Sequence, residues 1–169
     1  MHGAAGSAIP GAPMDITIEA RERFHAPADI AFVFAVLSDV PRSVSHYPDV
    51  ESLEDLGDGV YHWKLRKMGT AGISHQIKYA CRYVSDESAG VVRWTPVAGV
   101  GNCVIEGEWT LSADSAGTQV TFANTGTLSI PVPRLLRSAA APFVRSAFSG
   151  QMATYLANLR ATFAAPPAD

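Results

Sequence analysis

The most regular pattern of hydrophobic positions lies near the end of the chain, between residues 133 and 163. Large apolar side chains recur there at steps of three and four residues: Val144, Phe148, Met152, Tyr155, Leu159 and Phe163. This spacing places them on one face of an α-helix. The helix would be roughly 45 Å long, whereas a domain of this length has a radius of gyration of about 15 Å. We therefore expect one helix that crosses the whole molecule and is kinked or split at Pro142.

The earlier residues alternate between apolar and polar positions, as strands do. Residues 15–24 (DITIEARERF) form the first such segment. Two short segments, at 26–37 and 39–46, follow it, and each has a proline where the first turn of a helix would be. Turn signals such as Gly57-Asp58-Gly59 separate six more predicted strands, at 50–56, 60–68, 73–84, 91–95, 102–111 and 118–128.

No helical pattern interrupts the six later strands, so consecutive strands are expected to pair in antiparallel fashion. The predicted fold is α+β. A curved seven-stranded antiparallel sheet wraps around the long C-terminal helix, and the two short helices lie between the first and second strands. Because a helix cannot touch a strongly bent sheet everywhere, we expect a cavity between them. Large apolar cavities usually hold apolar ligands.

Composition narrows the classes of function. The 169 residues suffice for one domain, expected at 14–165 between a disordered leader at 1–13 and a disordered tail at 166–169. A net charge of −3 gives little support for nucleic-acid binding. The leader lacks the features of a signal peptide, and no apolar run has the length of a membrane span. With two cysteines and no CxxC pattern, we expect a soluble protein in the reducing cytoplasm.

Charge is distributed unevenly along the chain. No acidic residue occurs between positions 114 and 169, although four arginines do. Residues 131–145 combine Arg134 and Arg137 with four apolar side chains, namely Val132, Leu135, Leu136 and Phe143. Such a segment could rest on an anionic membrane surface. The favoured alternative is a kinked helix start whose arginines pair with the acidic body of the protein.

Strand periodicity assigns one set of side chains to the inner face of the sheet. All three tryptophans fall in this set, which indicates a cavity with aromatic walls. Tryptophans that simply fill the core would give the same pattern. Together with inward positions of the helix, the candidate ligand-binding residues are Trp63, His75, Ile77, Tyr79, Trp94, Ile105, Trp109, Phe122, Asn124, Phe148, Met152 and Tyr155.

Two polar residues, His75 and Asn124, fall on this apolar face. A buried polar group without a partner costs roughly 1–3 kcal/mol. The partner could be a ligand, a water molecule, or the hydroxyl group of Tyr79 or Tyr83. His75 could also act as a general acid or base near neutral pH, with Tyr79 as its helper. Asn124 could instead pair with the backbone near the end of its strand.

Other chemistry finds little support. The histidines at 25, 46, 62 and 75 show no metal-ligand spacing, so neither a metal nor a cofactor is predicted. Cys81 and Cys103 are expected two strands apart, at about 10 Å, which is too far for a disulfide. The glycine-rich turns at 69–72 and 96–101 lie at the same end of the predicted sheet. They suit a moving lid, although ordinary hairpins look the same.

Three local motifs accompany this order of elements: FHAPA at 24–28, EGEWTL at 106–111 and GTQVTF at 117–122. With them, residues 15–163 resemble the helix-grip superfamily. This START-like, birch-pollen-allergen-like group (SRPBCC) includes polyketide cyclase/dehydrase-type proteins. Its members carry lipids, bind hormones, cyclise polyketides or act as accessory subunits near membranes. The resemblance therefore implies a cavity more firmly than a reaction.

The main prediction is a protein that transports or sequesters a hydrophobic or aromatic small molecule or lipid in an internal cavity. The first alternative is a metal-free enzyme of the polyketide cyclase, aromatase or dehydratase type, with His75 as its acid/base group. The second alternative is a membrane-associated accessory or lipid-transfer protein that uses residues 131–145.

Overall fold

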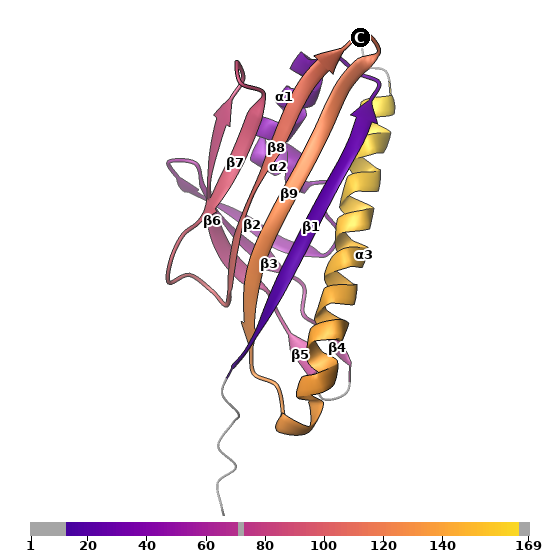
Figure 1. Cartoon of the computed structure of the whole chain (residues 1–169). Coiled ribbons are helices and arrows are strands. Elements are labelled where there is room, and N and C mark those ends of the chain that lie inside the picture. The colour runs from indigo at the N-terminus through magenta and orange to yellow at the C-terminus, as the bar shows by residue number, and fades with distance from the viewer. Residues whose placement is uncertain (1–12, 71–72, 166–169) are drawn as a thin grey trace, which may run out of the picture.

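The computed structural model describes residues 13–70 and 73–165, which form a curved sheet with a long helix along its concave side (Figure 1). Seven strands make up the main sheet, in the order β1-β9-β8-β7-β6-β3-β2, and all neighbours are antiparallel. The predicted sheet is thus confirmed. Its strands are β1 (Met14–Ala26), β2 (Val50–Gly57), β3 (Val60–Leu65), β6 (Lys78–Asp86), β7 (Val91–Pro96), β8 (Cys103–Asp114) and β9 (Gly117–Ile130).

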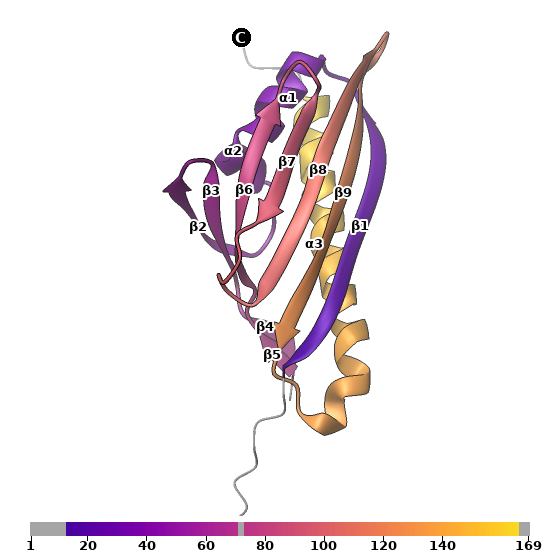
Figure 2. The ribbon, with the colours of Figure 1, turned by 60° about the vertical axis from the view of Figure 1, so that its left-hand side comes forward.

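Two short helices connect β1 to β2, as predicted. They are α1 (Ile30–Ser38) and α2 (Val40–Val44). Each begins at an aspartate whose carboxylate accepts a hydrogen bond from a backbone N–H group three residues later. Asp29 caps α1 in this way at 2.8 Å, and Asp39 caps α2 at 3.2 Å. Both helices pack against the same side of the sheet as the long helix (Figure 2).

The long helix is α3 (Arg137–Ala164), which follows a short 3₁₀ helix, η1 (Arg134–Leu136). The predicted apolar stripe is confirmed, because all six of its members are buried. Pro142 lies within α3 and does not split it. Two arginines hold α3 to β1 without using a carboxylate. Arg145 donates a hydrogen bond to the Thr17 carbonyl group at 3.0 Å, and the Arg160 guanidinium group lies 4.7 Å from the centre of the Phe24 ring.

The prediction of long, continuous third and fourth strands was wrong. β3 ends at Leu65, and the chain then leaves the main sheet to form a two-stranded ribbon of β4 (Met68–Thr70) and β5 (Ile73–His75). Contacts with α3 hold the ribbon away from the sheet. The Gln151 side-chain nitrogen lies 2.9 Å from the Met68 sulfur, and the His75 ring packs edge-on against the Phe143 ring. Residues 71 and 72 of the predicted glycine-rich lid lie outside the described residues.

The second predicted lid, the turn between β7 and β8, is fixed to the start of β6. Asn102 makes three hydrogen bonds there, two with the backbone of Lys78 (2.9 and 3.0 Å) and one to the Gln76 carbonyl group (2.8 Å). Gly101 has φ +72°, and a Cβ atom at this position would lie only 1.9 Å from the Lys78 carbonyl oxygen. These contacts favour an ordinary hairpin turn over a moving lid.

The expected leader at 1–13, apart from residue 13, and the expected tail at 166–169 lie outside the described residues. Within the part of the chain that the structure describes, none of the helices is long and apolar enough to cross a membrane.

Candidate functional site

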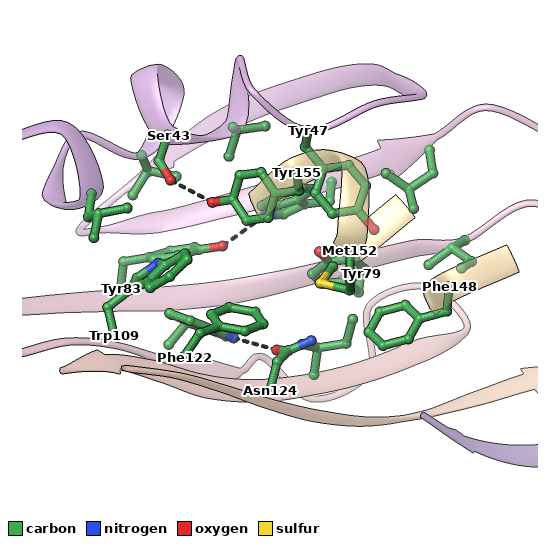
Figure 3. A pocket seen from close by; sticks show the side chains of 18 residues that line it. Ser43, Tyr47, Tyr79, Tyr83, Trp109, Phe122, Asn124, Phe148, Met152 and Tyr155 are labelled. Atoms are coloured by element: carbon green, nitrogen blue, oxygen red, sulfur yellow. Dashed lines mark hydrogen bonds between the residues drawn. The ribbon is translucent and has the colours of Figure 1, made fainter. Parts of the chain in front are cut away.

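An internal cavity with about 50 Å³ of free space lies between the inner face of the sheet and the helices (Figure 3). This space holds a few water molecules and is well below the roughly 300–1,000 Å³ of pockets that enclose drug-sized ligands. A ligand of that size would therefore have to push the walls apart. The lining residues are Leu37, Val40, Ser43, Val44, Tyr47, Trp63, Leu65, Ile77, Tyr79, Tyr83, Trp94, Ile105, Trp109, Phe122, Asn124, Phe148, Met152 and Tyr155.

Eleven of the twelve candidate ligand-binding residues meet around this cavity. Strands β3, β6, β7, β8 and β9 contribute most of them, and α3 contributes three. They are Trp63, Ile77, Tyr79, Trp94, Ile105, Trp109, Phe122, Asn124, Phe148, Met152 and Tyr155. Each is at most 7% exposed. Whether they bind a ligand stays a prediction.

The structure places the twelfth candidate, His75, outside the cavity lining. His75 is buried, but it belongs to the β4–β5 ribbon, and the centre of its ring lies 6.5 Å from that of Phe143. Its Nδ1 atom has no hydrogen-bond partner among the described residues. Burial lowers the pKa of His75 and so favours the neutral ring. The two residues proposed for catalysis are thus not together at the cavity wall, because Tyr79 lines it and His75 does not.

Seven lining residues were absent from the candidate set. Five come from the helical connection: Leu37, Val40, Ser43, Val44 and Tyr47. The predicted first helix is almost wholly apolar, so periodicity could not show which of its sides faces a cavity. Tyr47 lay in a segment taken as a helix end. The other two are Leu65 and Tyr83, which the strand pattern did place on the inner face.

Aromatic rings in mutual contact form much of the wall. Trp63 and Tyr79 stack with their planes 17° apart and their centres 5.4 Å apart. On the neighbouring strands, the centre of the Phe122 ring lies 4.5 Å from that of Trp109 and 5.9 Å from that of Trp94. Large rings in such contacts have little freedom to rotate, so the sheet side of the cavity is a stiff surface.

Most polar tips of these rings are paired. The hydroxyl groups of Tyr155 and Ser43 share a hydrogen bond of 2.6 Å, and the Trp63 indole nitrogen donates to the Tyr83 hydroxyl group at 3.0 Å (Figure 3). The Trp94 indole nitrogen donates to Oδ1 of Asn124 at 2.9 Å. These bonds offset the cost of burying polar atoms among apolar ones.

The cavity lining contains no group that ionises near neutral pH. Its titratable side chains are four tyrosines. Burial raises the pKa of Tyr155 to about 12, and it also raises the pKa values of Tyr47, Tyr79 and Tyr83 above their usual range. All four hydroxyl groups therefore stay protonated and can donate hydrogen bonds, but none is available as a general base.

Tyr47 separates the cavity from the surface. It lines both the cavity and an open hollow formed with Pro41, Leu53 and Tyr61. Its hydroxyl group donates a hydrogen bond to Oε1 of Gln151 at 3.3 Å, and the nitrogen of the same amide contacts Met68 of the ribbon. Met68 borders a second open hollow, beside α3. Tyr47, like Val44, thus stands between the cavity and the first of these hollows.

The described residues contain no group of three or more His, Cys, Asp or Glu side chains that could hold a metal ion. Cys81 and Cys103 are both buried and free, and burial raises the pKa of each thiol to about 12. The Cys81 thiol donates to the Ile105 carbonyl group at 3.2 Å. Such thiols are unreactive, so both cysteines have a structural role.

A curved antiparallel sheet that encloses an aromatic-walled cavity against a long C-terminal helix defines the helix-grip class of proteins. Within this class, a family profile described as polyketide cyclase / dehydrase and lipid transport matches residues 17–164. The chain belongs to this family. No curated protein matches the chain in sequence.

Solved structures share the fold at low sequence identity. The structure of TTHA0849 from Thermus thermophilus has a TM-score of 0.65 and 17% identity, covering 86% of this chain and 96% of that one. The Zhui aromatase/cyclase from Streptomyces sp. R1128 has a TM-score of 0.59 and 15% identity, covering 87% and 93%. A conserved protein from Geobacillus kaustophilus has a TM-score of 0.60 and 13% identity, covering 86% and 94%. These likenesses establish the helix-grip fold.

Proposed function

We propose that the protein binds a hydrophobic or aromatic small molecule or lipid in the cavity between the sheet and α3, as a carrier or a sequestering protein. The observation that carries this proposal is free space surrounded by three tryptophans, four tyrosines and two phenylalanines. A core built only for stability leaves few voids larger than a water molecule. The family description, which includes lipid transport, agrees with a ligand of this kind. Two free, buried cysteines agree with a cytoplasmic location.

The experiment is a pair of substitutions on one strand of the sheet. Ile105 lines the cavity, whereas its neighbour Val104 is 48% exposed on the outer face of β8. Ile105→Phe should weaken binding of an apolar fluorescent dye at least about fivefold, because overpacking costs about 1–3 kcal/mol. Val104→Phe should leave dye binding unchanged. Equal effects of the two substitutions, or no dye binding by the wild-type protein, would refute the proposal.

A polyketide cyclase, aromatase or dehydratase activity is the alternative. It is supported by the family description and by the Tyr79 hydroxyl group, which has no hydrogen-bond partner among the described residues and could polarise a ligand carbonyl group. In such an enzyme His75→Ala would reduce turnover and keep ligand affinity if His75 is the acid/base group. Since His75 lies outside the lining, we expect His75→Ala to change neither.

Contact with a membrane surface through residues 131–145 is a second candidate. One observation favours it: Leu135 of η1 is 94% exposed. The other apolar residues of this segment are less available, because Val132 is buried and both Leu136 and Phe143 are half-buried. A membrane contact at this place would deliver an apolar ligand close to the β4–β5 ribbon.

A further inference from the structure

The polar atoms of the cavity wall that have no protein partner are hydrogen-bond donors. Among the described residues, none accepts a hydrogen bond from Nδ2 of Asn124 or from the Trp109 indole nitrogen, and both of these atoms can only donate. The Tyr79 hydroxyl group, also without a partner, can donate or accept. None of these three atoms is among the fully enclosed side-chain atoms that lack a partner in the described part of the chain. They therefore border free space.

The orientation of the Asn124 amide group is fixed by its neighbour. An indole N–H group can only donate, so the amide atom facing Trp94 at 2.9 Å has to be the oxygen. The nitrogen is therefore on the other side of the amide group, turned away from the dashed bond in Figure 3. Asn124 is 4% exposed, so the protein interior surrounds it almost completely.

A glycine makes this pair possible. Gly107 of β8 lies between Trp94 of β7 and Asn124 of β9, and it is the register partner of both. A Cβ atom at Gly107 would lie 2.5 Å from the Trp94 ring, so a side chain here would displace the indole group. The bare glycine lets the Trp94 ring lie across β8 and reach the amide oxygen of Asn124. Residues of three strands, β7, β8 and β9, thus together fix the position of one hydrogen-bond donor, Nδ2 of Asn124, at the cavity wall.

We propose that Asn124 sets the ligand specificity of the cavity: its Nδ2 atom, positioned by Trp94, donates a hydrogen bond to a carbonyl oxygen of an otherwise apolar ring compound. This inference rests on the proposed binding function. A hydrocarbon of the same shape leaves the buried amide nitrogen unpaired and is disfavoured for that reason. Trp94 is a positioning residue, which acts by holding the amide group in one orientation.

The test compares indanone with indane, a ketone and a hydrocarbon of nearly equal size. The two ligands are titrated into ¹⁵N-labelled full-length protein, and dissociation constants are taken from chemical-shift changes. Indanone should bind roughly three- to tenfold more tightly, the usual effect of one net hydrogen bond. It should also shift the side-chain NH₂ resonances of Asn124, whereas indane should leave them nearly unchanged.

Three variants show whether Asn124 causes the preference. Asn124→Leu should bring the ratio of the two dissociation constants close to one. Trp94→Phe, which keeps Asn124 but frees its amide group to turn, should also reduce the ratio, and it tests the inference independently if the leucine variant does not fold. Phe148→Leu is the matched control, because Phe148 of α3 lines the same cavity without a polar atom. It should change both affinities and preserve their ratio.

The outcomes separate the two proposals. Equal binding of ketone and hydrocarbon by the wild-type protein, or a preference that survives both Asn124→Leu and Trp94→Phe, would overturn the specificity inference and leave the binding function standing. If neither compound binds, both the specificity inference and the proposed binding function are overturned.

Discussion

The two ends of the interface between the sheet and α3 are built from different side chains. One end, which we call the closed end, surrounds Phe163 near the C-terminus of α3. There Phe163 packs against Phe24 of β1 and Phe32 of α1, with ring centres 6.4 Å apart in both pairs. Phe163 is 1% exposed and Leu159, one turn earlier, is fully buried. The cavity half, defined by the eighteen lining residues, instead uses Trp, Tyr, Asn and Ser among its apolar side chains.

If the cavity binds a ligand as proposed, this difference separates stability from binding within one fold. Hydrocarbon side chains have no directional requirement and can interdigitate until no space remains. A ring with a polar tip has to point that tip at a partner, as Trp63 does toward Tyr83 and Tyr155 toward Ser43. Such bonds hold the rings in place without filling the space between them. The closed end should therefore contribute mainly stability and the cavity half mainly recognition.

The largest effect should follow from Phe163→Ala. Phenylalanine-to-alanine changes in a core cost about 3–5 kcal/mol, and the closed packing around Phe163 favours the upper part of this range. Denaturant unfolding monitored by circular dichroism would measure the loss. Dye affinity of the folded fraction should stay within about twofold, a change of roughly 0.4 kcal/mol. A large loss of affinity at unchanged stability would contradict the proposed division of roles.

Phe148→Ala, in the cavity half, should change ligand binding more than it changes stability. Phe148 already borders free space, so removing its ring breaks fewer contacts than at Phe163. We expect a loss of stability smaller by at least about 1 kcal/mol than for Phe163→Ala. The enlarged cavity should bind anthracene better than naphthalene, whereas the wild-type protein should prefer naphthalene. Calorimetric titration of the two hydrocarbons into both variants would measure the reversal, and an unchanged preference would count against Phe148 as part of the ligand wall.

The strand and helix patterns together identified eleven of the eighteen residues of the cavity half, for a simple reason. Side chains alternate between the two faces of a sheet wherever a strand begins or ends. Trp63, Trp94 and Trp109 could therefore be assigned to the inner face from the sequence alone. The apolar stripe of α3 followed from its helical period in the same way. Eleven candidate residues at the cavity wall could therefore be predicted without knowing where the turns lie.

The pattern failed where tertiary contacts decide. Residues 60–65 and 73–84 keep a strand-like alternation, which Arg66 and Lys67 interrupt. The chain leaves the main sheet after Leu65, and α3 offers Gln151 and Phe143 as partners for the ribbon. Alternation carries no information about that competition. His75 was therefore assigned to the right kind of environment, a buried one, but to the wrong element. Likewise, the apolar α1 shows no preferred face from which Leu37 could have been chosen.

A moderate effect is expected at the β4–β5 ribbon when the pH falls. Burial lowers the pKa of His75, so the unfolded chain takes up a proton at a higher pH than the folded chain does. Stability should therefore decrease as the pH falls from about 6.5 toward the lowered value, and His75 should have no effect above that range.

Unfolding experiments between pH 5 and 8 would measure this slope. His75→Phe should remove it, and His62→Phe, on the other face of β3 from Trp63, should not. Hydrogen exchange should locate the acid-sensitive amide groups in the ribbon beside α3. If the amide groups at the closed end became exchangeable at the same pH, the two ends would form one cooperative unit and the comparison would fail.

The smallest effect on stability is expected at η1, at the opposite end of α3 from Phe163 (Figure 1). Leu135 is 94% exposed and touches little, so the double substitution Arg134→Glu/Leu135→Asp should change stability by no more than about 0.5 kcal/mol.

The effect of this double substitution on membrane contact should be larger, because a basic residue near an anionic surface contributes about 1 kcal/mol and the double change also removes an apolar contact. Sedimentation with phosphatidylserine vesicles at low salt would measure the change. Val84→Asp is the control, since Val84 is 62% exposed on β6. If η1 is a membrane contact, only the η1 variant should lose sedimentation, and equal behaviour of the two variants would restrict ligand exchange to the aqueous phase.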